Sequence, residues 1–120
     1  MKYLMLLHSN PAAFAELSPD EQQAAFAFFA DLQHETMEAG EYIDAAGLAD
    51  ASHTRTVRSE GDAAVVTDGP FAESKEVLVS YALYDVESHD RAMELAAKVA
   101  TATSSAVEVW PIMDLSGTDM

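Results

Sequence analysis

The chain has 120 residues, of which 49% are hydrophobic and none is cysteine. Six Lys and Arg stand against 21 Asp and Glu, so the formal net charge is -15. This length and apolar content predict a single folded domain with its own core. The lack of cysteine excludes disulfide frameworks, thiolate metal sites and cysteine nucleophiles.

The negative charge also limits the partners. Nucleic acids and anionic membranes are bound through clustered Lys and Arg, so we expect neither partner. The apolar run from Tyr3 to Leu7 is too short for a signal peptide, and no apolar stretch reaches the length of a membrane span. We therefore expect a cytoplasmic protein.

The first third of the chain predicts a strand followed by a long helix. Residues 2–8 form a nearly continuous apolar run, typical of a strand buried on both faces, and Asn10-Pro11 ends it. Ser18-Pro19-Asp20-Glu21 is a helix-start signature, and Gly40 suits a helix end, so we expect a helix from about 19 to 39. Its predicted buried stripe is Ala25, Phe28, Phe29, Leu32, Thr36 and Ala39.

The middle of the chain predicts extended structure. Residues 41–48 form a weak strand signal, and residues 54–60 and 63–67 predict a β-hairpin that turns at Gly61-Asp62. Residues 68–76 have the composition of a loop, and Val77 to Val86 predict a strong strand.

The last part predicts a second helix and a final strand. Ser88 can cap a helix, whose predicted buried stripe is Ala92, Leu95, Ala96 and Val99. Residues 106–113 predict the last strand, and Pro111 limits its pairing because proline has no N–H to donate to a neighbouring strand. We expect the domain to cover residues 1–114 and the tail, residues 115–120, to be frayed.

This order of elements predicts a ferredoxin-like α+β fold, an antiparallel βαββαβ sheet with an inserted hairpin and both helices on one face. The strand from Val77 to Val86 is largely apolar on both faces, as is the first strand. Two helices can cover only one face, and a monomer rarely exposes so large an apolar surface. We therefore expect a homodimer in which two sheets pack face to face.

The loop Asp68-Gly69-Pro70-Phe71-Ala72-Glu73-Ser74-Lys75-Glu76 resembles the signature of the DGPF-type branch of the YCII-related proteins. Met1 to Leu4, Thr56 to Arg58 and Val107 to Pro111 fit the same family in order and spacing. The resemblance implies a dimeric α+β barrel. Some members are encoded beside or fused to alternative sigma factors, and an enzymatic role has been suggested for the family from its pocket residues.

This sequence departs from the family pattern at several positions. Val79 and Ser80 stand where many relatives have two glycines, and Trp110 stands where relatives often have Arg. Phe29 and Glu38 fall near the positions of a His and an Asp that have been proposed as a catalytic pair in another branch. Phe29 cannot transfer a proton, so we do not expect that chemistry here.

Seven residues are candidates for a site. His8, Asp68 and Glu73 could act as acids or bases, and a ligand could contact Arg58, Phe71, Lys75 and Tyr81. Each also has a structural alternative. His8 could simply face water at a strand end, Asp68 could cap its own turn with Phe71 plugged into the core, and Arg58 could pair with a carboxylate across the hairpin. Only one of Tyr81 and Tyr84 can face a given cavity.

We expect no metal and no cofactor. Asp31, His34, Glu35 and Glu38 share one face of the long helix, but that face lies opposite the apolar stripe, where solvent belongs. No phosphate loop, nucleophile elbow or dinucleotide fingerprint is present. Two functions remain open, a homodimeric barrel that binds a small molecule, with cofactor-free acid/base chemistry, or a regulatory module that docks on a sigma factor or another basic protein.

Overall fold

The structure is a computed structural model of the chain, and it describes residues 1–71 and 75–113. Glu73 and the tail that was expected to fray, residues 115–120, lie outside the described residues. In chain order, the elements are β1 (Lys2–Ser9), α1 (Pro11–Ala15), α2 (Pro19–Glu38), β2 (Tyr42–Gly47), the 3-10 helix η1 (Ala51–His53), β3 (Arg55–Glu60), β4 (Ala63–Asp68), β5 (Val77–Asp85), α3 (His89–Thr103) and β6 (Ala106–Pro111).

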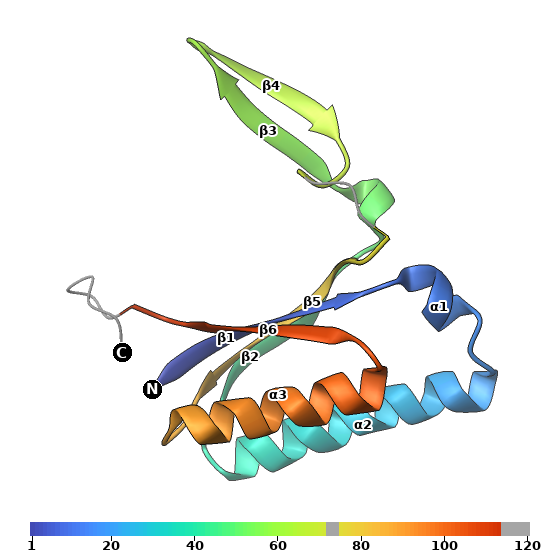
Figure 1. The fold of residues 1–120 in the computed structure, drawn as a ribbon, viewed down its shortest axis with the longest axis vertical. Helices are drawn as coiled ribbons and strands as arrows, with labels where there is room; N and C mark the ends of the chain where they lie inside the picture. The colour runs from blue at the N-terminus through green and yellow to red at the C-terminus, as the bar shows by residue number, and fades with distance from the viewer. Residues whose placement is uncertain (72–74, 114–120) are drawn as a thin grey trace.

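The main sheet has the strand order β2-β5-β1-β6, and each neighbouring pair is antiparallel. Helices α2 and α3 lie side by side on one face of this sheet, and the other face has no helix over it (Figure 1). This arrangement confirms the predicted ferredoxin-like α+β fold. The predicted apolar character of both sheet faces is also confirmed, as described below.

Helix α2 begins as its sequence predicts. Ser18 Oγ accepts a hydrogen bond from the Glu21 backbone N–H at 3.1 Å, and the Glu21 carboxylate accepts one from the Ser18 N–H at 3.1 Å. The predicted buried stripe is only partly correct, because Leu32 and Thr36 are buried whereas Phe29 is 37% exposed. The first half of α2 extends beyond α3 (Figure 1), so its apolar side is less covered than that of the second half.

A short helix, α1, was not predicted. Asn10 and Pro11 end β1 as predicted, and the Asn10 side chain accepts a hydrogen bond from the Ala12 N–H at 3.0 Å and caps a helical turn. Pro11 occupies the first helical position, where its missing N–H costs nothing.

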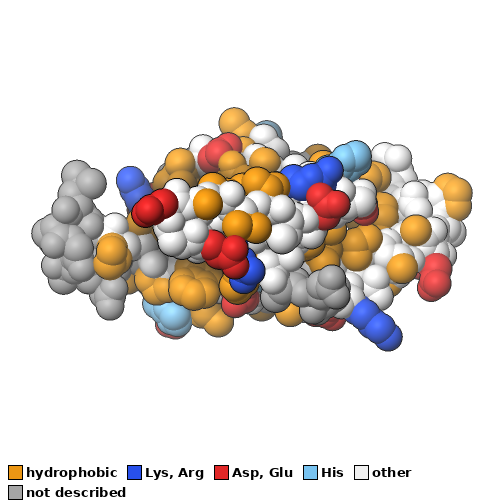
Figure 2. Space-filling view, turned by 90° about the horizontal axis from the view of Figure 1, so that it is seen from above, with side chains coloured by type: hydrophobic (Ala, Val, Ile, Leu, Met, Phe, Trp, Pro, Cys, Tyr) orange, Lys and Arg blue, Asp and Glu red, His pale blue; other side chains and the backbone are white. Residues whose placement is uncertain are grey.

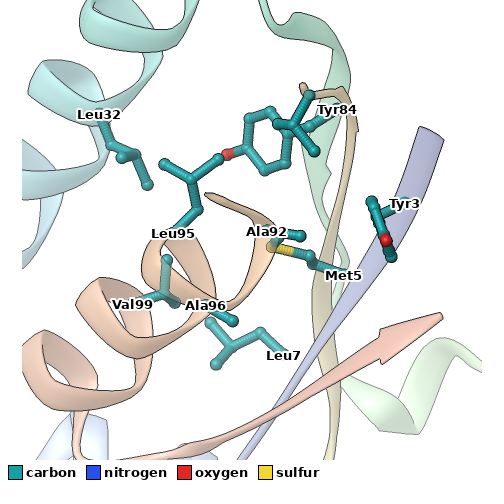
Figure 3. Close-up of a cluster of buried hydrophobic side chains, with 10 residues drawn as sticks. Tyr3, Met5, Leu7, Leu32, Tyr84, Ala92, Leu95, Ala96 and Val99 are labelled. Atoms are coloured by element: carbon teal, nitrogen blue, oxygen red, sulfur yellow. The ribbon is translucent and has the colours of Figure 1, made fainter. Parts of the chain in front are cut away.

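The core lies between the sheet and α3 (Figure 3). Helix α3 buries the four residues of its predicted stripe, and Leu95 is fully buried. Leu32 of α2 packs against the same cluster. The sheet contributes the side chains that point toward the helices, namely Tyr3, Met5, Leu7, Tyr84 and Val86.

A bulge in β5 changes which of its residues face the helices. Leu7 pairs with Ser80 and His8 pairs with Leu78, so Val79 is an extra residue on β5. Val79 packs against the core, whereas Leu78 is 40% exposed. Strict alternation of side chains along β5 would place Val79 on the same face as Tyr81 and Leu83, away from the helices. The bulge makes that assignment of Val79 wrong. Leu78 joins Tyr81 and Leu83 on the uncovered face.

The hairpin β3–β4 has the predicted turn, with Gly61 at φ +60. Among the described residues it pairs with no strand of the main sheet, and it projects from the sheet on the side opposite the helices (Figure 1). The radius of gyration is 16.5 Å, whereas a compact chain of this length has about 14 Å. The projecting hairpin accounts for the excess.

Candidate functional site

We call the sheet surface opposite α2 and α3 the open face. In its centre, Leu4 of β1 lies between Leu83 of β5 and Trp110 of β6, and Leu6 lies between Tyr81 and Glu108. Trp110 is 53% exposed. Figure 2 looks onto the hairpin side of the molecule and shows hydrophobic side chains at the surface across its width. The other members of the open face are Ile43, Asp44, Ala46, Leu78, His8 and Ala106.

His8 lies on the open face, one residue before the end of β1. Its Nε2 is 2.5 Å from Glu108 Oε1 on the neighbouring strand β6. Its side chain is 29% exposed, so it is more sheltered than a histidine that simply faces water. An ionised carboxylate only accepts hydrogen bonds, so with a neutral ring the proton lies on Nε2 and Nδ1 carries the lone pair.

Tyr81 also lies on the open face, whereas Tyr84 is buried in the core. The Tyr81 hydroxyl donates a hydrogen bond of 2.8 Å to Asp44 Oδ2 on β2. This hydrogen bond raises the pKa of Tyr81, so its phenol stays protonated near neutral pH. Its hydroxyl oxygen can still accept a hydrogen bond from a ligand.

The two polar pairs lie close together on an apolar surface. Tyr81 is directly opposite Leu6, and His8 is two residues further along β1, so His8 and Tyr81 are diagonal neighbours. Glu108 and Asp44 flank them on the outer strands β6 and β2. The arrangement places an imidazole and a phenol hydroxyl near each other on one apolar surface.

The hairpin residues that the sequence singled out lie away from this surface. Asp68 forms an ion pair with Arg55 Nε at 3.1 Å and is almost fully exposed, so no turn cap by its side chain is seen among the described residues. The ion pair across the hairpin therefore involves Arg55, whereas Arg58 lies opposite Val65 and forms none within the described part of the chain.

The loop after β4 is held by backbone groups of Gly69. Its N–H donates to the Thr54 carbonyl at 2.7 Å, and its carbonyl accepts from the Thr56 hydroxyl at 2.7 Å. The expected plug of Phe71 in the core is wrong, because Phe71 is 77% exposed. The hairpin stands apart from the sheet, so Phe71 has no core to enter within one chain.

The hairpin and His8 nevertheless belong to the same end of the sheet. The loop returns to the sheet at Val77, which pairs with Ser9, and His8 pairs with Leu78. Lys75 therefore lies two residues before the sheet, near the His8 end, but no ion pair joins it to Asp68 in the described ranges. A single chain does not gather all the predicted site residues, and a site that includes the loop remains a prediction.

Neither the groove between α2 and α3 nor a cluster of metal ligands provides a better site in the described part of the chain. A shallow groove of about 620 Å³ runs between α2 and α3 over Phe28, Leu32 and Ala97. The charged groups at its rim bind each other, with Lys98 Nζ 3.1 Å from Glu35 Oε1. Within residues 1–71 and 75–113, no group of three or more His, Asp or Glu side chains is arranged to hold a metal ion.

Sequence reasoning missed Glu108 and Asp44, the partners of His8 and Tyr81. A signal was present for both, since each is a lone acidic residue within an otherwise apolar strand. Their role depends on the strand order and register, which place them beside His8 and Tyr81. Neither property can be read from one strand alone.

The described helices include none with the length and apolar character needed to cross a membrane.

A sequence comparison finds that the chain is 30% identical over 114 residues to an uncharacterised protein of Rhizobium meliloti (strain 1021), covering 93% of this chain and 92% of that protein. The sequence model of the YCII-related domain matches residues 1–116, nearly the whole chain. With the ferredoxin-like fold already established, the chain belongs to the YCII-related family.

Proposed function

We propose that this protein is a homodimer that binds a small molecule between the open faces of its two sheets and carries out acid/base chemistry there without a cofactor. The observation that carries the proposal is the open face itself. It is apolar, it has no helix over it, and it holds the two polar pairs His8–Glu108 and Tyr81–Asp44.

The dimer follows from the cost of leaving this surface in water. Leu4, Leu6 and Leu83 form its centre on the two inner strands, and Trp110 extends it to an edge strand. Contiguous apolar patches of this kind mark interfaces or binding sites on soluble proteins. A twofold axis brings the same surface from a second copy, so apolar side chains meet apolar side chains on both sides.

The chemistry follows from the state of the two polar pairs. Glu108 holds the His8 ring so that Nδ1 can take a proton from a ligand, and the resulting imidazolium is stabilised by the same carboxylate. Tyr81 stays protonated and orients the ligand through its hydroxyl. The ligand class is therefore a small molecule with an apolar body and a polar group that carries an exchangeable proton.

Ligand binding is tested by a thermal-shift screen of small apolar hydroxy, keto and carboxylic acids. We expect a compound that raises the melting temperature of the wild type to lose its effect in His8→Gln and Tyr81→Phe and to keep it in Asp68→Asn and Lys75→Ala. Loss of the effect in the last two variants, with the first two unchanged, would place the site in the loop and overturn this proposal.

A second function, docking of a basic protein such as a sigma factor, is favoured by one observation. The first half of α2 exposes Phe26, which is 61% exposed and stacks edge-on against Phe14 of α1. Asp20 and Glu21 lie in the first turn of the same helix, and the whole chain has a formal net charge of -15. An exposed aromatic patch on a strongly acidic protein suits a basic partner. Loss of capture of such a partner in Phe26→Asp, with ligand binding retained, would support this function.

A further inference from the structure

We propose that the hairpin β3–β4 is an arm that docks on the second protomer through the face formed by Val57 and Val66. This inference rests on the proposed homodimer. It concerns a surface separate from the open face, and it assigns the hairpin a role that neither the core nor the polar pairs require.

The first argument is the exposure of apolar residues on one side of the hairpin. Val57 and Val66 are directly opposite each other, and they are 62% and 60% exposed. Ala64 extends the same face, because it lies two residues from Val66 on the same strand. Valines paired across two strands stabilise a sheet more when another surface packs on them and buries the rest of their apolar area.

The second argument is that the hairpin has no further strand beside it in the described ranges. Its strands pair only with each other in the described part of the chain, and an isolated two-stranded hairpin is marginally stable in water. The Arg55–Asp68 ion pair and the bonds of Gly69 hold its base but leave its outer part without cover. A folded arm of this length therefore requires a surface on another molecule.

The third argument identifies that molecule. The arm projects on the same side of the sheet as the open face, from the end at which His8 lies (Figure 1). Two sheets that pack face to face are about 10 Å apart, whereas six residues of strand span about 20 Å. An arm rising from one sheet is thus too long to end in the gap, and it must run along the flank of the second protomer.

The arm can be tested with single thiols, because the chain has no cysteine. Val66→Cys places a thiol on the proposed docking face, and Val65→Cys places one on the opposite face of the same strand. In a single chain Val66 is 60% exposed and Val65 is half-buried, so an undocked arm reacts faster with a maleimide at position 66. A docked arm reverses this order, with the Val66→Cys thiol slower by roughly tenfold.

Sedimentation of the same two variants distinguishes failure of the docked arm from failure of the proposed homodimer. A dimer in which the Val66→Cys thiol is still the faster one would overturn the arm and leave the proposed function standing. A monomer at micromolar concentration would overturn both. Adding Leu4→Asp, which disrupts the open face, should restore fast reaction at position 66. Continued protection in that monomer would show that the hairpin packs on its own chain, and the proposal would fail.

Discussion

Arg91 and Glu41 are 50 residues apart in the chain, and their side chains meet through two hydrogen bonds, 2.8 Å from Nε to Oε2 and 2.9 Å from Nη2 to Oε1. Both side chains are mostly buried, with 18% and 12% of their surface exposed. The same guanidinium also contacts Glu35 of α2 and Glu94 of α3. This cluster joins the end of α2, the start of β2 and the start of α3.

The first prediction concerns the geometry of that ion pair. Arg91→Lys keeps the charge but cannot form both hydrogen bonds to Glu41, so we expect a loss of about 2 kcal/mol in the free energy of unfolding. Urea denaturation measures this change. Arg55→Lys is the matched control, because its ion pair with Asp68 is exposed and should matter little. Equal losses in the two variants would show that the bidentate geometry is unimportant.

The second prediction concerns the stability of the fold at low pH. Hydrogen bonds from Lys98 and then from Arg91 lower the pKa of Glu35. A carboxyl whose pKa is lowered by folding contributes stability above its unfolded pKa, and this contribution disappears as the pH falls through its folded pKa. Glu35→Gln should therefore reduce the loss of stability between neutral pH and about pH 3, as measured by urea midpoints across that range.

The control for the acid experiment is Glu16→Gln. Glu16 is exposed at the end of α1 and forms no ion pair among the residues that the structure describes. The Glu16→Gln variant should therefore show the same change in stability with pH as the wild type. If Glu16→Gln flattens that dependence as much as Glu35→Gln does, then general charge reduction is responsible and the Glu35 contacts are not.

The third prediction tests the core. Leu95 is fully buried against the sheet, whereas Met93, two residues earlier on α3, is 45% exposed. Leu95→Ala should lower the free energy of unfolding by about 2–5 kcal/mol, because it removes buried methyl groups and leaves a cavity. Met93→Ala should have a much smaller effect. Similar unfolding midpoints for the two variants would contradict the placement of α3.

The sequence predicted well the features that depend on neighbouring residues. The capping box at Ser18 and Glu21, the Gly61 turn and the buried stripe of α3 are all local signals, and each is confirmed. The fold followed because the order of elements allows few topologies once crossovers are right-handed. The asparagine cap of α1 was also a local signal, but Asn10-Pro11 is equally typical of the end of a strand.

The features that sequence reasoning missed depend on distant parts of the chain. Periodicity along α2 shows an apolar stripe but not where the covering structure ends, so the exposure of Phe29 was not foreseen. The bulge at Val79 shifts the faces of β5 without any glycine or proline to mark it. The partners of His8 and Tyr81 were missed because they depend on the register of neighbouring strands.

The fourth prediction concerns the base of the hairpin. Gly69 has φ +86, a conformation that residues with a side chain rarely adopt, and its backbone groups bind Thr54 and Thr56. Gly69→Ala should loosen the hairpin and speed its cleavage by a protease at low concentration. Gly47→Ala is the control, because Gly47 has no positive φ and its substitution meets no neighbouring atom. Equal cleavage of both variants would contradict the role of Gly69.

The last prediction tests the open face as the dimer interface. Leu4 is half-buried at the centre of that face, between Leu83 and Trp110, whereas Phe26 is exposed on α2. Leu4→Asp places a charge where a second apolar surface would meet it, and burying an unpaired carboxylate is far costlier than leaving it in water. Sedimentation should therefore give a 12.9 kDa monomer for Leu4→Asp and twice that mass for the wild type. Phe26→Asp adds the same charge away from the interface and should remain dimeric. If instead only Phe26→Asp dissociates, the twofold contact runs through α2, and His8 and Tyr81 would face solvent in the dimer.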